Sequence, residues 1–331
     1  MPLLSSYGLS GGLAFRGGGQ ALETFNKIFT YTGSVQTFSA PSETTTLTAY
    51  VFGPGGGSEA DQNSNGGAGG YSVGTINSAA GATFKIVVGG GGGPGTQNNG
   101  SGGGYSGVFT NAWNGNSVST DHNASIILAG GGGGSGDNNR GNPHGGGAGG
   151  GNSGQTGATP SGGGGGTQNG GGQYRNNGGG NCTAPGPQGN CRGAQLRGGI
   201  ACGGQQNGAA TGWPNRIYGG QWASAAGRNG CNSGGGGAGY YGGAGGGGSP
   251  NSSSGGGGSG YIGGHPSHPV NNANTYTGSG RDLPPQATSS PYWPGNQVGR
   301  GGIRSTNHAR GQQYGGDGRV VIEYEAFEPV G

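Results

Sequence analysis

The chain has 331 residues, of which 97 are glycine, and only 27% of its residues are apolar. Lys and Arg number 14 against 11 Asp and Glu, and the resulting net charge of +3 is too small to indicate a large basic surface for nucleic acid. Glycine does not recur at every third position, which excludes collagen, and no apolar run reaches the roughly 18 residues of a membrane span.

The first residues are expected to form an attachment arm that docks on a larger assembly. Residues 1–22 include Gly11-Gly-Leu-Ala-Phe-Arg-Gly-Gly-Gly19, a stretch too short and too broken to fold as a domain. A frayed terminus is the alternative. The start has neither the basic nor the apolar region of a Sec-type signal peptide, so we expect no such signal.

Strand signals begin at residue 24. Runs rich in β-branched and aromatic residues predict strands within 24–32, 33–41, 44–52, 66–76, 82–88, 105–111, 125–129 and 318–325. Residues 44–52 carry hydrophobic side chains on both faces, which is typical of an internal strand. These strands predict an all-β fold with almost no α-helix: an antiparallel jelly-roll sandwich in residues 23–130, completed by the strand at 318–325, with residues 326–331 as a tail.

Residues 131–317 are expected to form a glycine-rich bundle inserted before the last strand. Ordering a residue's backbone costs about 1–2 kcal/mol, and glycine loses the most freedom, so this region needs extensive hydrogen bonding if it is ordered. One alternative is a disordered polar tract. We favour a bundle of extended polyglycine II helices with three residues per turn, because readable strands frame the region and only 8% of the chain is charged.

All four cysteines lie in this glycine-rich region, at Cys182, Cys191, Cys202 and Cys231. Their spacings do not match the short pairs typical of structural zinc sites. We expect two disulfides, with Cys182 to Cys191 and Cys202 to Cys231 as the most local of three pairings, although free thiols are an alternative. Disulfides persist in oxidising surroundings, and without an export signal they indicate a protein released by lysis, such as a virion component.

Aromatic residues in polar loops are the candidate ligand-binding residues. Rings among Asn, Gln and Arg suit the faces and hydroxyls of sugars. The alternative is that they cap the ends of polyglycine helices, and Trp113 is expected to be structural. The candidates are Trp213, Arg216, Tyr218, Trp222, Tyr292 and Trp293.

Motifs for catalysis are missing from the sequence. The many Gly-x-Gly-x-x-Gly matches arise from glycine abundance, and none lies between a predicted strand and a predicted helix. His265-Pro-Ser-His268 is flanked by proline on an extended loop, so we discount it as a metal site. No serine or cysteine lies in a recognisable nucleophile elbow. We therefore expect no enzyme, no metal and no cofactor.

Five segments carry a resemblance to a known family. They are Phe29-Thr-Tyr-Thr-Gly-Ser-Val-Gln-Thr-Phe38, Gly66-Gly-Ala-Gly-Gly-Tyr71, Phe84-Lys-Ile-Val-Val-Gly-Gly-Gly-Gly92, Gly255-Gly-Gly-Gly-Ser-Gly-Tyr-Ile-Gly-Gly264 and Gly318-Arg-Val-Val-Ile-Glu-Tyr324. In this order they resemble the glycine-rich module of anaplastic-lymphoma-kinase-type receptors over residues 24–325. The resemblance implies a tumour-necrosis-factor-like sandwich with polyglycine helices and a role in extracellular recognition. No kinase region accompanies it, so the chain is more similar to the viral or phage surface proteins that carry such modules.

These observations favour a non-enzymatic virion surface protein, such as a capsid or tail fibre, spike or decoration, located at the virion surface or outside cells. Its expected partners are other virion proteins, through the N-terminal arm, further copies of itself, with a trimer as the plausible state, and a host glycan. One alternative is a structural matrix or filament protein with no specific ligand. A second is a glycine-rich RNA-binding protein, based on scattered Arg-Gly pairs.

Overall fold

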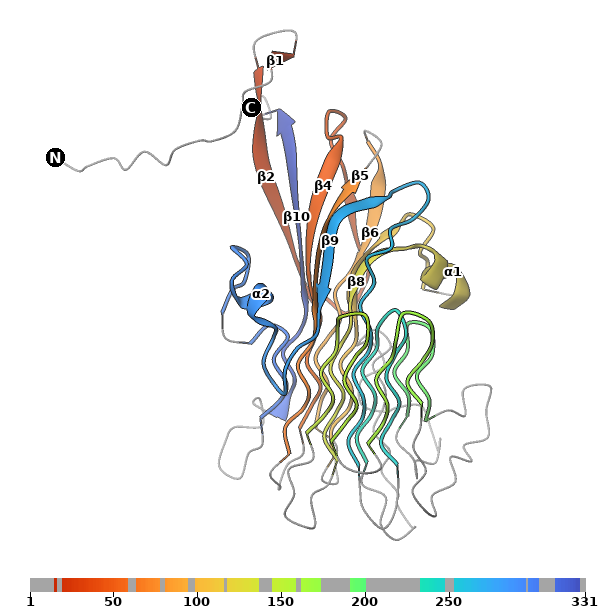
Figure 1. Ribbon diagram of the computed structural model, residues 1–331. Helices are drawn as coiled ribbons and strands as arrows, with labels where there is room; N and C mark the ends of the chain where they lie inside the picture. Colours follow the sequence, from red (N-terminus) through yellow and green to blue (C-terminus); the bar gives the residue numbers. More distant parts are fainter. Residues whose placement is uncertain are drawn as a thin grey trace, which may run out of the picture.

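The computed structural model describes residues 15–16, 20–58, 64–77, 81–94, 99–115, 118–136, 145–158, 162–173, 191–200, 233–247, 253–295, 297–303 and 313–327. These residues form two antiparallel β-sheets above an array of glycine-rich segments (Figure 1). Helices within them are short, α1 at Val118–Asn123 and α2 at Pro285–Thr288. The predicted all-β class is confirmed.

Six strands form the larger sheet, in the order β1-β2-β10-β4-β5-β9. Their bounds are β1 Phe15–Arg16, β2 Gln20–Thr30, β10 Arg319–Phe327, β4 Thr46–Phe52, β5 Tyr71–Asn77 and β9 Val270–Tyr276. The smaller sheet has the order β3-β6-β7-β8. Its strands are β3 Gln36–Ser39, β6 Thr83–Val87, β7 Ser106–Thr110 and β8 Ser125–Ala129.

The two sheets share one hydrophobic core. Alternate residues of β4 point into it, with Leu47 and Val51 almost fully buried, and they belong to the same buried cluster as Phe84 and Ile86 of β6. Strand β4 lies between β10 and β5, so the prediction that residues 44–52 form an internal strand is confirmed. Its other face also packs, because Phe52 and Tyr71 bury themselves beneath the segment that carries α2.

Strand β9 lies inside residues 131–317, which were expected to hold the glycine bundle and its polar loops. Its sequence, Val270-Asn-Asn-Ala-Asn-Thr-Tyr276, is mostly polar and lacks the alternation that identifies a strand. It pairs with β5 at the border of the larger sheet, where its outer side has no neighbouring strand among the described residues. An edge strand needs fewer apolar side chains, which explains why the sequence pattern missed it.

Strands of the sandwich continue directly into the glycine-rich segments. β4 runs on into residues 53–58, β6 into 89–94 and β8 into 130–136, while 64–70 lead into β5, 99–105 into β7 and 313–318 into β10. Figure 1 shows these segments side by side in the lower half of the molecule. The array therefore includes glycine runs from within residues 23–130 as well as from the later region, and six of its segments are positioned by the strands that they continue.

Each central segment of the array is hydrogen-bonded to neighbours on six sides. Residues 130–136 exchange backbone hydrogen bonds with segments 53–58, 64–70, 99–104, 145–151, 233–239 and 253–260. The bonds repeat every three residues. Gly131 and Gly134 donate to the carbonyls of Ala238 and Gly235, and the carbonyls of Gly130 and Gly133 accept from Gly70 and Gly67. A three-residue repeat aims successive amides at different neighbours, and this repeat satisfies backbone groups that would otherwise be buried without partners.

Packing at this spacing requires glycine. A Cβ atom added at Gly132 would lie 1.9 Å from the carbonyl oxygen of Gly67, and one at Gly257 would lie 2.1 Å from that of Ala148. Carbon and oxygen cannot approach so closely. Larger residues occur where the array leaves room, such as the fully buried alanines at positions 68, 148, 238 and 244.

Candidate ligand pocket

The segment around α2 covers part of the outer face of the larger sheet. Leu283 and Ala287 are buried against Phe52 and Tyr71, and Trp293 packs against the same cluster. Pro285 lies in the first turn of α2. Backbone N–H groups there have no acceptor within the helix, so the missing N–H of proline costs no hydrogen bond. Apolar burial thus holds this short segment on the sheet.

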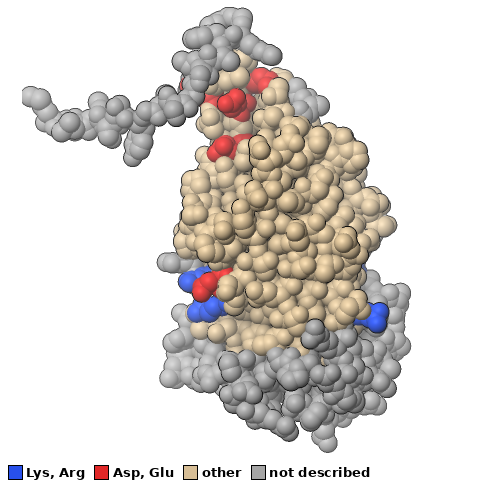
Figure 2. Space-filling view, in the orientation of Figure 1, with Lys and Arg blue, Asp and Glu red and all other residues tan. Residues whose placement is uncertain are grey.

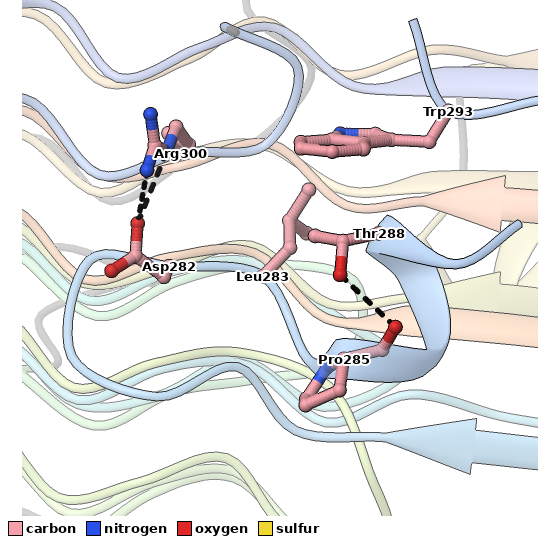
Figure 3. A pocket seen from close by; sticks show the side chains of 6 residues that line it. All are labelled: Asp282, Leu283, Pro285, Thr288, Trp293 and Arg300. Carbon is pink, nitrogen blue, oxygen red and sulfur yellow. Dashed lines mark hydrogen bonds and ion pairs between the residues drawn. The ribbon is translucent and has the colours of Figure 1, made fainter. Parts of the chain in front are cut away.

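A pocket of about 420 Å³ opens beside α2, lined by Asp282, Leu283, Pro285, Thr288, Trp293 and Arg300. Figure 3 shows the indole of Trp293 facing Leu283, with the side chains of Asp282 and Arg300 farther along. The Nε1–H of Trp293 is buried and has no hydrogen-bond acceptor within the described part of the chain. The pocket therefore offers a ligand the indole ring of Trp293, while the Nε1–H lies below the accessible surface.

An ion pair forms the polar side of the pocket. The Nε and Nη2 atoms of Arg300 donate to Oδ1 of Asp282 at 3.0 Å and 2.7 Å. Their side chains are 38% and 58% exposed, so the pair adds little to stability but holds both groups in place. Burial lowers the pKa of the neighbouring Arg281, and the charge of Arg300 lowers it further.

Tyr292 is tied to the sheet and does not line the pocket. Its hydroxyl donates to Oε2 of Glu323 on β10, and its ring meets that of Tyr50 edge-on at 4.8 Å. Burial raises the pKa of Tyr292, and the hydrogen bond to the carboxylate raises it further. Of the two sequence candidates in this segment, Trp293 therefore belongs to the pocket, and Tyr292 helps to fix the segment that carries it.

The other sequence candidates lie elsewhere. Trp213, Arg216, Tyr218 and Trp222 fall outside the described residues, as do Cys182, Cys202 and Cys231. Cys191 is buried, and its carbonyl accepts from the amide of Gly245 in the array. The disulfide pairing stays a prediction. Trp113 is buried against Phe109 in a second core cluster, in agreement with the structural role expected for it.

Sequence reasoning missed most of the residues that line the pocket. Asp282, Leu283 and Thr288 lie in a stretch with no recognisable motif, and the ion pair joins residues from separate turns. The signal that could have marked the region is Pro291-Tyr-Trp-Pro294, which places two large rings between prolines.

The described ranges contain neither a metal-binding cluster nor a membrane-spanning helix. These residues contain no group of three or more His, Cys, Asp and Glu side chains placed to hold a metal ion. His265 and His268 pair through their backbones in a tight turn, with ring centres 6.5 Å apart. Within the same ranges, neither helix has the length and apolar character needed to cross a bilayer.

No protein-family model matches the chain, and no curated protein matches it.

Proposed function

We propose that this chain is a non-enzymatic surface protein of a virion, such as a capsid or tail fibre, spike or decoration. In this proposal, a sandwich of jelly-roll, tumour-necrosis-factor-like topology carries a bundle of polyglycine II helices. The three-residue repeat of hydrogen bonds and the six neighbours around residues 130–136 support the polyglycine II assignment, because that helix has three residues per turn and no internal hydrogen bonds.

A rigid platform is what such a bundle offers a surface protein. Its amides and carbonyls bond to neighbouring segments, so the bundle can stay ordered with few large side chains. In the proposed arrangement, the part of the N-terminal arm ahead of β1 attaches the protein to other virion proteins, because β1 and β2 include residues 15–16 and 20–22 of the arm expected over residues 1–22. Among the described residues, the face drawn in Figure 2 is largely uncharged, with acidic side chains near the upper end of the sheets and a few basic side chains near the array. A surface of this kind favours neutral ligands over nucleic acid.

We propose a host-surface glycan as the ligand of the pocket beside α2. The observation that carries this proposal is the half-buried ring of Trp293, which lines the same pocket as the exposed ion pair of Asp282 and Arg300. A sugar ring can stack its C–H face on the indole while its hydroxyls bond to the carboxylate and the guanidinium. The other candidate ligand-binding residues, Trp213, Arg216, Tyr218 and Trp222, lie outside the described residues and stay predictions.

A glycan-array screen with matched variants tests the proposal. Trp293→Ala and Asp282→Ala are each expected to weaken binding, the tryptophan change by about tenfold or more because buried aromatic anchors dominate such contacts. Tyr292→Phe keeps the ring and loses only the hydroxyl bonded to Glu323, so it should bind like the original protein. Thermal unfolding of each variant separates lost binding from lost folding.

Two other outcomes identify the alternatives. Absence of binding to every glycan, with all variants folded, contradicts the glycan proposal and favours a matrix or filament protein. RNA binding that weakens steeply with salt favours the nucleic-acid alternative.

A further inference from the structure

One side of β2 is left open. β2 pairs with β10 along Leu22–Thr30, but on its other side β1 covers only Gln20 and Ala21. Among the described residues, no strand pairs with the outer side of Leu22–Thr30, and Figure 1 shows β2 at the border of the sheet. Open edges present unpaired backbone groups that readily pair with another strand.

Side chains along this edge are also exposed. Ile28 is 47% exposed, and with Val35 it makes up the exposed large hydrophobic side chains of the described residues. Glu23, Thr24, Asn26 and Lys27 are exposed as well. An exposed isoleucine on an open edge is a feature that soluble proteins usually avoid unless something covers it.

The sequence of β2 is complementary to itself when read in reverse around Phe25. In an antiparallel pair of two copies centred on Phe25, Glu23 lies opposite Lys27 of the partner, and Leu22 lies opposite Ile28. Thr24 lies opposite Asn26, so every pair is either opposite in charge, apolar or polar. Centring the pair on Asn26 or Thr24 instead places Lys27 opposite Phe25 or Ala21 and loses both ion pairs. Directly opposite side chains contribute most to strand pairing. Two apolar, two uncharged polar or two oppositely charged side chains are favourable partners, whereas two like charges are unfavourable.

From this pattern we infer that Leu22–Ile28 is a self-association edge, which pairs antiparallel with the same segment of a second copy about a two-fold axis at Phe25. The pairing joins two six-stranded sheets into one continuous sheet. β1 ends each edge at Ala21, so a pair centred on Phe25 extends over Leu22–Ile28, and the charge pattern favours this register. This edge is short and buries little surface area compared with permanent interfaces. The dimer is therefore expected to form and dissociate reversibly as the protein concentration changes. This inference does not depend on the proposed function.

Charge exchange tests the register. Sedimentation of the full chain over a concentration series should show a monomer–dimer equilibrium. Glu23→Lys and Lys27→Glu each place like charges opposite each other twice in the dimer, so each should raise the dimer dissociation constant by about tenfold or more. The double variant E23K/K27E restores opposite charges and should return the dissociation constant to that of the original protein. Lys85→Glu on β6, in the other sheet, is the matched control and should change nothing.

Several results would overturn the inference. They are a protein that stays monomeric at every concentration, single reversals without effect, and a double variant that fails to recover. Deleting residues 1–14 tests whether the chain's own N-terminal segment occupies the edge. If dimers appear only after this deletion, that segment covers the edge in the full chain.

Phe25→Cys gives an independent readout, because only a pair centred on this residue brings the two new thiols to within disulfide distance. A 25-to-25 link found by mass spectrometry supports the register, and its absence under oxidising conditions contradicts it.

Discussion

Gly132 illustrates how closely the array segments approach one another. It donates to the carbonyl of Pro54 and accepts from the amide of Gly103, and the place where a Cβ would stand is 1.9 Å from the oxygen of Gly67. Neither side is a flexible side chain that could move aside. The contact is between two backbones that are each hydrogen-bonded to several others, so relief of a clash would shift more than one segment.

Gly132→Ala is therefore expected to lower the free energy of unfolding by about 1–3 kcal/mol or more, the range of overpacked cores. Urea unfolding measures the change. Gly170→Ala is the matched control, because nothing lies within 4 Å of an added Cβ there, and it should change stability by about 0.5 kcal/mol or less. Equal stability of both variants would contradict the close packing described for Gly132.

Elements differ in how well the sequence predicted them. Strands β4 and β6 were predictable because their core faces repeat at every second residue, as in Phe84 and Ile86. The glycine runs could be recognised by composition, but their six neighbours could not, since a glycine run carries no side chains that specify a partner. Six of the segments are continuous with strands, which place them in the array, and strand order is a property of the whole chain.

The candidate site was harder to predict for the same reason. Trp293 stands out in the sequence by its ring, yet its neighbours in the pocket come from a turn near residue 282 and from Arg300, which only the folded segment around α2 brings together. The role of Tyr292 also depended on a distant residue, Glu323 of β10.

A stack of rings joins α1 to the array. His122 of α1 stacks on Tyr240 at 4.0 Å, and Tyr240 stacks on Tyr261 at 3.9 Å, with Tyr241 edge-on to the histidine. Burial lowers the pKa of His122, although hydrogen bonds to Asn123 and the backbone of Tyr240 act in the opposite direction. The folded protein therefore favours the neutral imidazole.

This shift predicts a loss of stability in mild acid. Because the folded-state pKa lies below the ordinary value of about 6.5, the unfolded chain binds the proton more readily, and stability present above pH 6.5 falls as the pH drops toward the folded-state pKa. His122→Phe keeps a ring in the stack and should reduce the difference in unfolding free energy between about pH 7.5 and 5.5. Burial also lowers the pKa of His268, so some dependence should remain. An unchanged pH profile in His122→Phe would contradict the role given to this stack.

At the scale of the whole molecule, the sandwich and the array are built from the same continuous stretches of the chain. Six segments pass from one to the other without a turn, for example from Phe52 to Gly53 and from Ala129 to Gly130. The array has few large side chains, so it depends on the sandwich to hold its segments in register. The sandwich in turn has strands whose ends are fixed by the array. Because the hydrophobic core of the sandwich and the hydrogen bonds of the array act on the same continuous segments, we predict that both parts unfold in one transition.

A core substitution far from the glycine runs tests this coupling. Ile322→Ala removes a fully buried side chain from β10 and should cost about 2–5 kcal/mol. If unfolding is cooperative, the amides of Gly255, Gly256 and Gly257 lose hydrogen-exchange protection by the same free energy, although no side chain near them has changed. Val35→Ala, at a 38% exposed position, should leave their exchange unaltered.

Amides that exchange as fast as in a short peptide before any substitution would show that the array is not formed. Protection that survives Ile322→Ala unchanged would show instead that the array is stable without the sandwich, and the sharing of strands would then have only a geometric role.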